Sequence, residues 1–459
     1  MIMYQSINPF SKENIQNLAF ESIESLNEKL IRSDSAYKNW RKYSINDRKP
    51  YFKNLISVLT KEKELLAREI TLEMGKPLLE SIAEIDKCIG TTEWYLNNVD
   101  AIIQQHLPTV SIEHIKSQIA FEPIGAVLGI MPWNFPYWQV FRYAIPTLLI
   151  GNTVLLKHAP NVPGCAQSLE KIFKLAGFPD DLFLSLYPAV EDIEYIIASP
   201  AVQAVTVTGS ERAGRSVASL AGKHLKKCVL ELGGSDPFIV LADAPIKQTV
   251  AEAIKGRLQN NGQSCIAAKR FIIHEQCYDA FLKELKEQLN ARIIGDPMLK
   301  ETHLGPMARA DLKEQLSKQV QSSVAAGADC TYKHPFDDSN SNFFSPLILE
   351  NIPANSPARA EELFGPVFSC IRVTDTNEAI AVANETRFGL GASIWSNTIT
   401  EAEKLSQHIE AGSVFINGIT RSDARLPFGG IKQSGFGREL SVFGLQEFVN
   451  VKTYWVNEQ

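Results

Sequence analysis

A cysteine and a glutamate, each set in an unusual local sequence, are the residues of this chain best suited to chemistry. Cys265 ends the segment NGQSC at 261–265, and Glu231 begins the segment ELGG at 231–234. A thiol in a glycine-containing turn, with a carboxylate on another loop, suits covalent catalysis followed by hydrolysis of the intermediate. Cys265 could otherwise be a small buried core residue, and Glu231 a solvated carboxylate at a strand end. The residues alone leave both interpretations open.

Further short motifs occur along the chain in a fixed order. They are PWNFP at 132–136, TGS at 208–210, ELFGP at 362–366 and PFGG at 427–430. With these separations, the motifs resemble those of the aldehyde dehydrogenase superfamily over nearly the whole chain. The resemblance implies an α/β fold with two doubly wound parallel-sheet domains and a small β element for oligomerisation. It also implies oxidation of an aldehyde to a carboxylic acid with NADP or NAD.

The resemblance gives the catalytic residues definite roles. A Cys265 thiolate would attack the aldehyde carbon and form a thiohemiacetal. Its oxyanion would be stabilised by the Asn134 side-chain amide and the Cys265 backbone N–H, and one such donor typically lowers the barrier by roughly 3–4 kcal/mol. Without the resemblance, Asn134 would be a turn residue between two prolines. Hydride loss to a nicotinamide leaves a thioester, for whose hydrolysis Glu231 is the candidate general base, since apolar neighbours raise the pKa of a carboxyl group.

The cofactor motifs differ from the Rossmann fingerprint, because no GxGxxG segment follows a strand. A strand-like run instead ends at Thr208-Gly209-Ser210 before a helical stretch, and a glycine turn at a helix N-terminus is suited to phosphate. In the family this serine contacts the pyrophosphate, although Ser210 alone would also fit a helix N-cap. The resemblance adds these residues to the cofactor site: Trp133, Lys157, Gly233, Glu362 and Phe364.

Cofactor choice is expected to depend on a departure from the family pattern at Pro160. Many members carry Lys-Pro-Ala-Glu, in which the glutamate holds the ribose hydroxyls; here the segment is Lys157-His158-Ala159-Pro160. Loss of the anionic group removes repulsion of a 2′-phosphate beside Lys157. The hypothesis is therefore use of both NADP and NAD, with a preference for NADP.

Basic and polar residues near Asn134 indicate an anionic substrate. If the segment after Pro136 is helical, Gln139 and Arg142 share one face, and an arginine there could bind a carboxylate. These segments resemble the shorter bacterial succinate semialdehyde dehydrogenases, whose carboxylate partners match Gln139, Arg142 and Ser422. Arg425 is added from its charge alone. Alternatively, Arg142 caps a helix and Arg425 pairs with Asp423.

Alternative functions also fit some of these residues. The alternative substrates are general aliphatic aldehydes or 4-aminobutyraldehyde, although a cationic substrate would favour acidic or aromatic walls. A different class is a cysteine hydrolase or acyltransferase that needs no nucleotide. Such an enzyme pairs its cysteine with an imidazole, and His274, the histidine nearest in sequence, belongs to a strand-like run. A non-catalytic role predicts lost catalytic residues, whereas Asn134, Glu231 and Cys265 are all present.

The composition bounds the class of protein. Of 459 residues, 45% are hydrophobic and 21% charged, as in a soluble globular protein of two or three domains. A net charge of −6 argues against nucleic acid as a partner. The seven cysteines form no CxxC or Cys/His cluster, so neither disulfides nor a metal site is expected. Neither a signal peptide nor a membrane span is expected, which favours a cytoplasmic protein.

The elements that must position these residues follow from capping and periodicity. Ser44 with Asp47 predicts a capping box that opens a long helix, which Gly75 ends. Alternation over 110–122 predicts hairpin strands, and the C-terminal VNVKTYWVN predicts an exposed strand that favours a homodimer or a dimer of dimers. Alternating strand-like and helical runs predict two parallel sheets. The expected domains are cofactor-binding at 1–104 and 124–233, catalytic at 234–432, and oligomerisation strands at 105–123 and 447–459.

Overall fold

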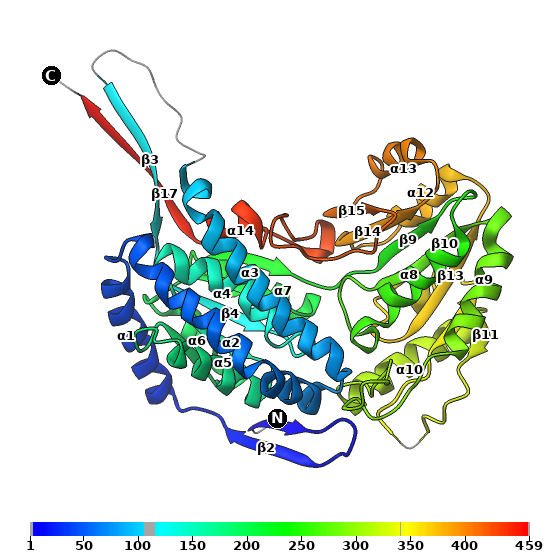
Figure 1. Ribbon diagram of the computed structural model, residues 1–459, viewed down its shortest axis with the longest axis horizontal. Helices are drawn as coiled ribbons and strands as arrows, with labels where there is room; N and C mark the ends of the chain where they lie inside the picture. Colours follow the sequence, from blue (N-terminus) through cyan, green and yellow to red (C-terminus); the bar gives the residue numbers. More distant parts are fainter. Residues whose placement is uncertain (1–2, 105–114, 340, 458–459) are drawn as a thin grey trace.

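The structure is a computed structural model that describes residues 3–104, 115–339 and 341–457. Two mainly parallel sheets, each covered by helices, form two lobes that lie side by side (Figure 1). The chain completes most of the first lobe before it enters the second. This arrangement confirms the predicted fold of two doubly wound α/β units.

The sheet of the first lobe has the strand order β16-β8-β7-β4-β5-β6. Its strands are β4 (Ala126–Met131), β5 (Thr153–His158), β6 (Phe183–Leu186), β7 (Val202–Thr208), β8 (Lys227–Glu231) and β16 (Gly435–Phe436). All pairs are parallel except β16 with β8. Nearly continuous apolar sequences, such as AVLGIM in β4, let these strands be buried on both faces.

Helices cover both faces of this sheet, as a doubly wound fold requires. The helices on one face are α2 (Ile45–Met74), α3 (Leu78–Gln104), α4 (Trp138–Ile150) and α5 (Pro163–Leu175), and those on the other are α1 (Ile23–Trp40), α6 (Ile193–Ala198) and α7 (Glu211–Lys223). The predicted domains leave 433–446 unassigned. From that stretch, β16 pairs with β8, and α14 (Ser441–Glu447) packs on α4.

The second lobe repeats the design with the strand order β11-β12-β13-β10-β9-β14-β15. Its strands are β9 (Asp236–Val240), β10 (Ala268–His274), β11 (Asp329–Lys333), β12 (Leu347–Glu350), β13 (Val367–Val373), β14 (Gly391–Trp395) and β15 (Ser413–Ile416). The helices on one face are α8 (Ile246–Leu258) and α9 (Glu275–Asn290), and those on the other are α10 (Ala310–Ala325), α11 (Pro357–Ala360), α12 (Thr376–Asn384) and α13 (Ile399–Ser406). Only the edge strand β11 runs antiparallel to its neighbour in this sheet.

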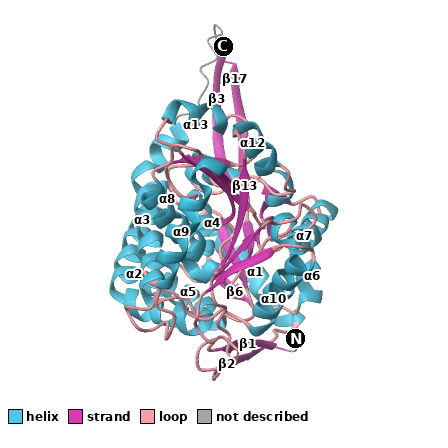
Figure 2. Cartoon of the chain, turned by 90° about the vertical axis from the view of Figure 1, so that its right-hand side faces the viewer, coloured by secondary structure: helices cyan, strands magenta, loops and turns pink. Residues whose placement is uncertain are grey.

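Two antiparallel ribbons lie outside the sheets (Figures 1 and 2). One joins β1 (Met3–Ile7) to β2 (Asn14–Ala19), and the other joins β3 (Ile115–Pro123) to β17 (Val449–Asn457). The prediction of hairpin strands within 110–122 is wrong for the described part, since 115–123 is one strand whose partner is β17. Residues 105–114 of the predicted oligomerisation strand lie outside the described residues.

The long helix α2 begins and ends where the sequence predicted. The Ser44 hydroxyl accepts the backbone N–H of Asp47, whose carboxylate accepts the backbone N–H of Ser44, which completes the capping box. Gly75, with φ of 82°, ends the helix in the left-handed conformation. Within the described ranges, no helix combines the length and apolar character needed to cross a membrane.

Candidate active site

Segments from both lobes meet over the carboxyl ends of β4 and β7. These strands are neighbours in the sheet, although β5 and β6 lie between them in the chain, so their junction is the topological switch point of the first lobe. Pro132 and Trp133 follow β4, Gly209 and Ser210 follow β7, and all four line a cavity of about 480 Å³. Open α/β sheets bind ligands at this position. We call this space the larger cavity.

Cys265 lies in a tight loop between α8 and β10. Three residues that precede it, Asn260, Asn261 and Gly262, have φ of 58°, 56° and 76°. Asparagine and glycine enter this left-handed region at the lowest cost. The Asn260 side-chain amide donates to the Asn134 carbonyl at 2.8 Å, which joins the loop to the segment after β4. The polar, glycine-containing sequence before Cys265 thus builds a turn that a core strand would not contain.

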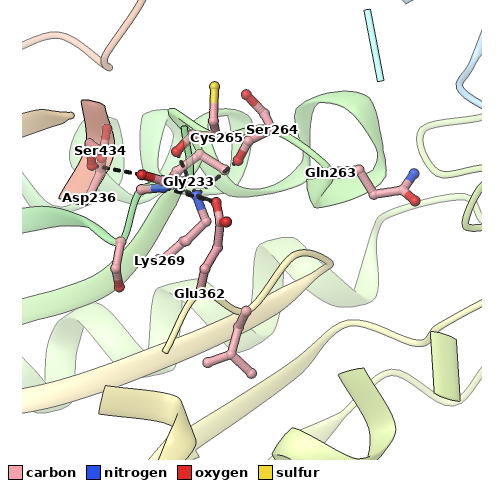
Figure 3. A network of polar contacts seen from close by, with 12 residues as sticks. Gly233, Asp236, Gln263, Ser264, Cys265, Lys269, Glu362 and Ser434 are labelled. Atoms are coloured by element: carbon pink, nitrogen blue, oxygen red, sulfur yellow. Dashed lines mark hydrogen bonds and ion pairs between the residues drawn. The ribbon is translucent and has the colours of Figure 1, made fainter. Parts of the chain in front are cut away.

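A buried lysine fixes the backbone on the other side of this loop (Figure 3). Lys269 Nζ donates to the carbonyls of Ser264 at 2.9 Å and Cys265 at 2.7 Å, and lies 3.3 Å from Oε1 of Glu362. Glu362 also accepts the backbone N–H of Gly234 at 3.1 Å. The Cys265 sulfur points away from these contacts in Figure 3. The backbone is therefore held in place while the thiol stays available for chemistry.

The Cys265 side chain borders two cavities, the larger one and a smaller one of about 210 Å³. Desolvation by the surrounding protein raises the pKa of the thiol to about 12, against the opposing charges of Arg142 and Lys269. At neutral pH the thiol is therefore protonated. Formation of the nucleophilic thiolate requires a group that can accept its proton.

Glu231 supplies a buried carboxyl group to the larger cavity. The residue is 2% exposed, and neither carboxylate oxygen has a hydrogen-bond partner among the described residues. Burial, and then the nearby charge of Glu439, raise the pKa of Glu231 well above its ordinary value. A Cβ on Gly429 would lie 2.7 Å from Oε1 of Glu231, so the glycine in the PFGG motif leaves room for it. Such a carboxyl group is suited to exchange protons within the cavity.

Asn134 lines the larger cavity together with Cys265 and Glu231. Its side-chain nitrogen donates to the Gln263 carbonyl at 3.0 Å. A primary amide carries two N–H groups, so a second one is left for an oxyanion. The structure thus brings the three residues expected to be catalytic to one cavity, from segments far apart in the sequence.

The larger cavity fits a nucleotide at its phosphate-binding end. The Ser210 hydroxyl accepts the backbone N–H of Ala213 at 3.3 Å, which confirms the helix N-cap at the start of α7. A Cβ added to Gly209 would meet nothing within 4 Å, so the turn before this helix N-terminus is open to a phosphate. The rings of Trp133 and Phe364 are 6.0 Å apart, edge to face, and also line the cavity. The other expected cofactor residues in its lining are Thr208, Gly233 and Glu362.

Two expected cofactor residues, Lys157 and Pro160, are not among the described residues that line the larger cavity. They lie at and beyond the carboxyl end of β5, which pairs with β4 so that Met131 lies opposite His158. They therefore belong to the same sheet edge as the cavity. Burial lowers the pKa of Lys157 to about 8, and its ammonium lies 5.8 Å from the centre of the Tyr4 ring.

The smaller cavity is bounded by α3, α4 and the segment 420–422. Gln139 and Arg142 both line it, and their position on α4 confirms the predicted helical spacing. Gln139 also lines the larger cavity. Ser422, the third residue expected to contact substrate, is in the lining as well.

Arg142 is occupied by contacts within the protein. Its Nε lies 2.7 Å from Oε2 of Glu439, and Nη2 donates to the Thr208 hydroxyl at 3.3 Å. The guanidinium carbon lies 4.7 Å from the centre of the Phe428 ring. The positive charge of Arg142 is therefore balanced by a buried carboxylate, a partner that the sequence motifs did not indicate.

The structure does not bring Arg425 to the lining of the smaller cavity, and the alternative pairing with Asp423 is present. Its side chain is 69% exposed and forms two hydrogen bonds with the Asp423 carboxylate, at 2.8 and 2.7 Å. The described lining of the smaller cavity includes Arg421 and Ser422 but not Arg425. The local pairing of opposite charges two residues apart decides the position of this side chain.

Sequence reasoning missed three charged residues at the site, namely Lys87, Lys269 and Glu439. Lys269 stands at the start of an apolar strand, where a charge is unusual, and this was the only signal for it. Lys87 and Glu439 lie outside the recognised motifs and reach the site only through the packing of α3 and of the segment after β16. Among the described residues, no group of three or more His, Cys, Asp or Glu side chains could hold a metal ion.

Comparisons with a family model, with related sequences and with solved structures all give the same family. The aldehyde dehydrogenase family model matches residues 2–454. A Synechocystis sp. protein named as a probable NADP-dependent succinate-semialdehyde dehydrogenase is 43% identical, over 98% of this chain and 99% of its own length. The Escherichia coli protein Sad, named as an NAD(P)-dependent succinate semialdehyde dehydrogenase, is 42% identical over 98% of this chain and 97% of its own.

Solved structures agree with these relatives. The crystal structure of succinic semialdehyde dehydrogenase from Streptococcus pyogenes, in complex with NADP+, superposes with a TM-score of 0.96 at 35% identity. The match covers 99% of this chain and 100% of that chain. The shared fold and the six ordered motifs have one explanation. The chain belongs to the aldehyde dehydrogenase family, the enzymes that oxidise aldehydes with NAD(P).

Proposed function

We propose that this enzyme oxidises succinate semialdehyde to succinate, with NADP preferred over NAD. The observation that carries the proposal is that Cys265 borders both the larger cavity and the smaller, basic cavity. A nucleotide in the first and an aldehyde with a distal carboxylate in the second would both reach the thiol. The relatives from Synechocystis sp. and E. coli, which are named for this aldehyde, support the assignment.

The proposed reaction begins when the Cys265 thiol gives its proton to solvent water in the cavity and the sulfur of the resulting thiolate bonds to the aldehyde carbon. The carbonyl π electrons move to oxygen, and the oxyanion accepts hydrogen bonds from the Asn134 amide and the Cys265 backbone N–H. Loss of one such donor slows acyl-transfer enzymes by roughly 10²- to 10³-fold. When bound in the larger cavity, a nicotinamide nucleotide supplies the hydride acceptor that brings the carbon to the oxidation level of an acid.

Cys265 then carries a thioester, which Glu231 helps to hydrolyse. Glu231, in its ionised form, takes a proton from a water molecule whose oxygen attacks the thioester carbon. The carbon–sulfur bond breaks, its electrons return to sulfur, and the acid leaves. The unpartnered carboxylate oxygens of Glu231 and its position on the cavity wall support this role.

The proposed nucleotide site uses Ser210 and the N-terminus of α7 for the pyrophosphate, and Glu362 with Phe364 for the nicotinamide end. Lys157 would reach the adenine ribose from the end of β5. Pro160 stands where a carboxylate would repel a 2′-phosphate, so its neutral side chain supports the preference for NADP. In the smaller cavity, Gln139, Arg142 and Ser422 are the proposed contacts of the distal carboxylate.

We also propose that the enzyme forms a homodimer or a dimer of dimers through the β3–β17 ribbon. Several large apolar side chains of β17 are exposed on it, including Val451, Tyr454, Trp455 and Val456. A cytoplasmic location is proposed too, because all seven cysteines are free thiols.

A steady-state kinetic panel tests the proposed substrate. Succinate semialdehyde, glutarate semialdehyde, butyraldehyde and 4-aminobutyraldehyde would each be oxidised with NADP and with NAD. The proposal expects the highest kcat/KM for succinate semialdehyde with NADP. Equal values for butyraldehyde would reject a carboxylate-specific site, and oxidation of each aldehyde should depend absolutely on NADP or NAD.

A further inference from the structure

Lys87 places a partly buried ammonium group on the wall of the smaller cavity. The residue lies on α3, and its Nζ donates to the Ser422 hydroxyl at 2.7 Å. The ammonium also lies 4.2 Å from the centre of the Trp138 ring, a distance at which the ring face attracts a cation. Both partners line the same cavity. Neither carries a negative charge.

The carboxylates nearest to Lys87 are engaged elsewhere. Glu84 pairs with buried Lys76, and its Oε1 accepts the backbone N–H groups of Tyr137 and Trp138 at 2.8 Å each. These two N–H groups stand at the start of α4, where a carboxylate is favoured by the helix dipole. Glu84 is thus committed to a structural role.

Two carboxylates outside the lining of the smaller cavity are also paired with arginines. Asp423 forms two hydrogen bonds with Arg425, and Glu439 pairs with Arg142. No carboxylate of the described residues lies within ion-pair distance of Nζ of Lys87. Among the cations that line the smaller cavity, Arg142 is paired with a buried carboxylate and Arg421 is exposed, whereas Lys87 is partly buried and has no ion pair with the described residues.

A positive charge that is withdrawn from water without a close counter-ion is costly even when it is only partly buried, so its retention on a cavity wall indicates a ligand of opposite charge. We propose that Lys87, acting with the Ser422 hydroxyl, binds the distal carboxylate of the substrate and selects short aldehydes that end in a carboxylate. This inference rests on the proposed function. It makes Lys87, rather than Arg142, the source of the net positive charge that the substrate meets.

The order of the charged residues along α3 agrees with binding of the substrate carboxylate at Lys87. Glu80 also lines the smaller cavity, and it accepts the backbone N–H of Asn260, in the loop of Cys265, at 2.6 Å. Seven residues along a helix span about 10 Å. The helix therefore presents a carboxyl group towards the reacting end of the cavity and an ammonium group towards the far end, which favours the orientation with the carboxylate away from Cys265.

The test compares Lys87→Met and Lys87→Arg with the wild-type enzyme on succinate semialdehyde and butyraldehyde. Butyraldehyde has the same chain length without the charge. For Lys87→Met we expect kcat/KM for succinate semialdehyde to fall by about 10-fold or more, the value of a charge-assisted contact, and kcat/KM for butyraldehyde to change by less than about twofold. Lys87→Arg should keep most of the preference. Lys63→Met removes an exposed lysine that pairs with Asp86 on α3, and is the matched control.

The outcomes separate this inference from the proposed function. A wild-type enzyme without preference for succinate semialdehyde would reject the proposed function itself. A wild-type preference that survives in Lys87→Met, or equal losses on both substrates, would reject the role of Lys87 alone. NADP binding and the melting temperature of each variant show whether a loss comes from misfolding.

The ratio of the two kcat/KM values should also depend on pH. Burial, and then the charge of Arg142, lower the pKa of Lys87 to about 8, whereas Cys88, Glu84 and Asp423 oppose this shift. A lysine with a lowered pKa loses its charge as pH rises, so the preference should fall between about pH 7 and about pH 9.5. Titration of Cys265 and Glu231 affects both substrates and cancels in the ratio. The ratio should stay flat in Lys87→Arg, and a flat ratio in the wild type would contradict the inference.

Discussion

At the scale of single residues, the ion pair between Arg142 and Glu439 stabilises the protein next to the catalytic groups. Their side chains are 2% and 3% exposed. Arg142 extends from α4 and Glu439 from the segment after β16, so the pair joins the helix beside Asn134 to the C-terminal part of the chain. Breaking a buried pair by removal of one partner leaves an uncompensated charge.

Arg142→Ala should therefore destabilise the protein. We expect the free energy of unfolding, measured in guanidinium chloride, to fall by about 3–5 kcal/mol, because Glu439 keeps its buried charge without a counter-ion. The double variant Arg142→Met with Glu439→Gln, which removes both charges, should recover part of this loss. Unchanged stability in Arg142→Ala would show that the pair contributes nothing.

Pro160→Glu should shift the cofactor preference towards NAD. Two unit charges 4 Å apart at an effective dielectric of 20 interact by about 4 kcal/mol, and screening reduces this energy. We therefore expect the ratio of kcat/KM with NADP to kcat/KM with NAD to change by a factor on the order of tens. Pro179→Glu, at an exposed proline of the same lobe, is the control. An unaltered ratio in Pro160→Glu would remove the electrostatic account of cofactor choice.

The residues that could be predicted from sequence are those whose motif fixes their local backbone. Cys265, Glu231 and Asn134 each belong to such a motif, and all three line one cavity. Arg425 lies outside the cavity lining, because its side chain pairs with the carboxylate of its neighbour Asp423. Lys87 was missed for the opposite reason, since its environment is built by partners distant in the chain, which no local pattern reveals.

At the scale of elements, the loop that carries Cys265 is tied to its surroundings by Asn261. The side-chain nitrogen donates to the carbonyls of Gly75 at 3.0 Å and Pro306 at 2.9 Å, and the side-chain oxygen accepts the backbone N–H of Gly305 at 2.8 Å. One side chain thus joins the C-terminus of α2, the catalytic loop and the second lobe.

Asn261→Ala should cost both stability and activity. Three hydrogen bonds are lost at about 1 kcal/mol each, and alanine is strained at the φ of 56°, so we expect the free energy of unfolding to fall by about 3–5 kcal/mol. A displaced Cys265 should also lower kcat by about 10-fold or more. Asn351→Ala is the matched control, because Asn351 has φ of 50° on the surface and one hydrogen bond, to Asp329. Equal effects of the two substitutions would contradict this role of Asn261.

Elements were predictable where local chemistry defines their ends. The capping box at Ser44 and the left-handed Gly75 gave the bounds of α2 without reference to the rest of the fold. Alternation over 110–122 identified strand character but not the partner. Pairing of β3 with β17 joins segments from opposite ends of the chain, and sequence periodicity carries no information about such distant pairing.

At the scale of the whole molecule, the β3–β17 ribbon extends away from both lobes (Figures 1 and 2). Val451 and Trp455 on it are 58% and 53% exposed, which is unusual for large apolar side chains. The larger cavity, by contrast, is lined by segments of both lobes.

Val451→Lys with Trp455→Lys should yield monomers. Two charges on the exposed ribbon would be buried in any interface that uses it, at a cost that a subunit contact would not offset. Light scattering after size-exclusion chromatography should report a mass near the 51.0 kDa of one chain. Thr453→Ser, on the same strand, adds no charge and is the control. Wild-type protein that is already monomeric would refute the proposed role of the ribbon.

The central claim is that succinate semialdehyde is oxidised while bound covalently to Cys265. The most direct measurement is mass spectrometry of Glu231→Gln after brief mixing with succinate semialdehyde and NADP, because loss of the general base should let the thioester accumulate. The account predicts a succinyl group on the Cys265 peptide, formed with a burst of NADPH, and its absence in Cys265→Ala. No adduct, or an adduct on another cysteine, would contradict it.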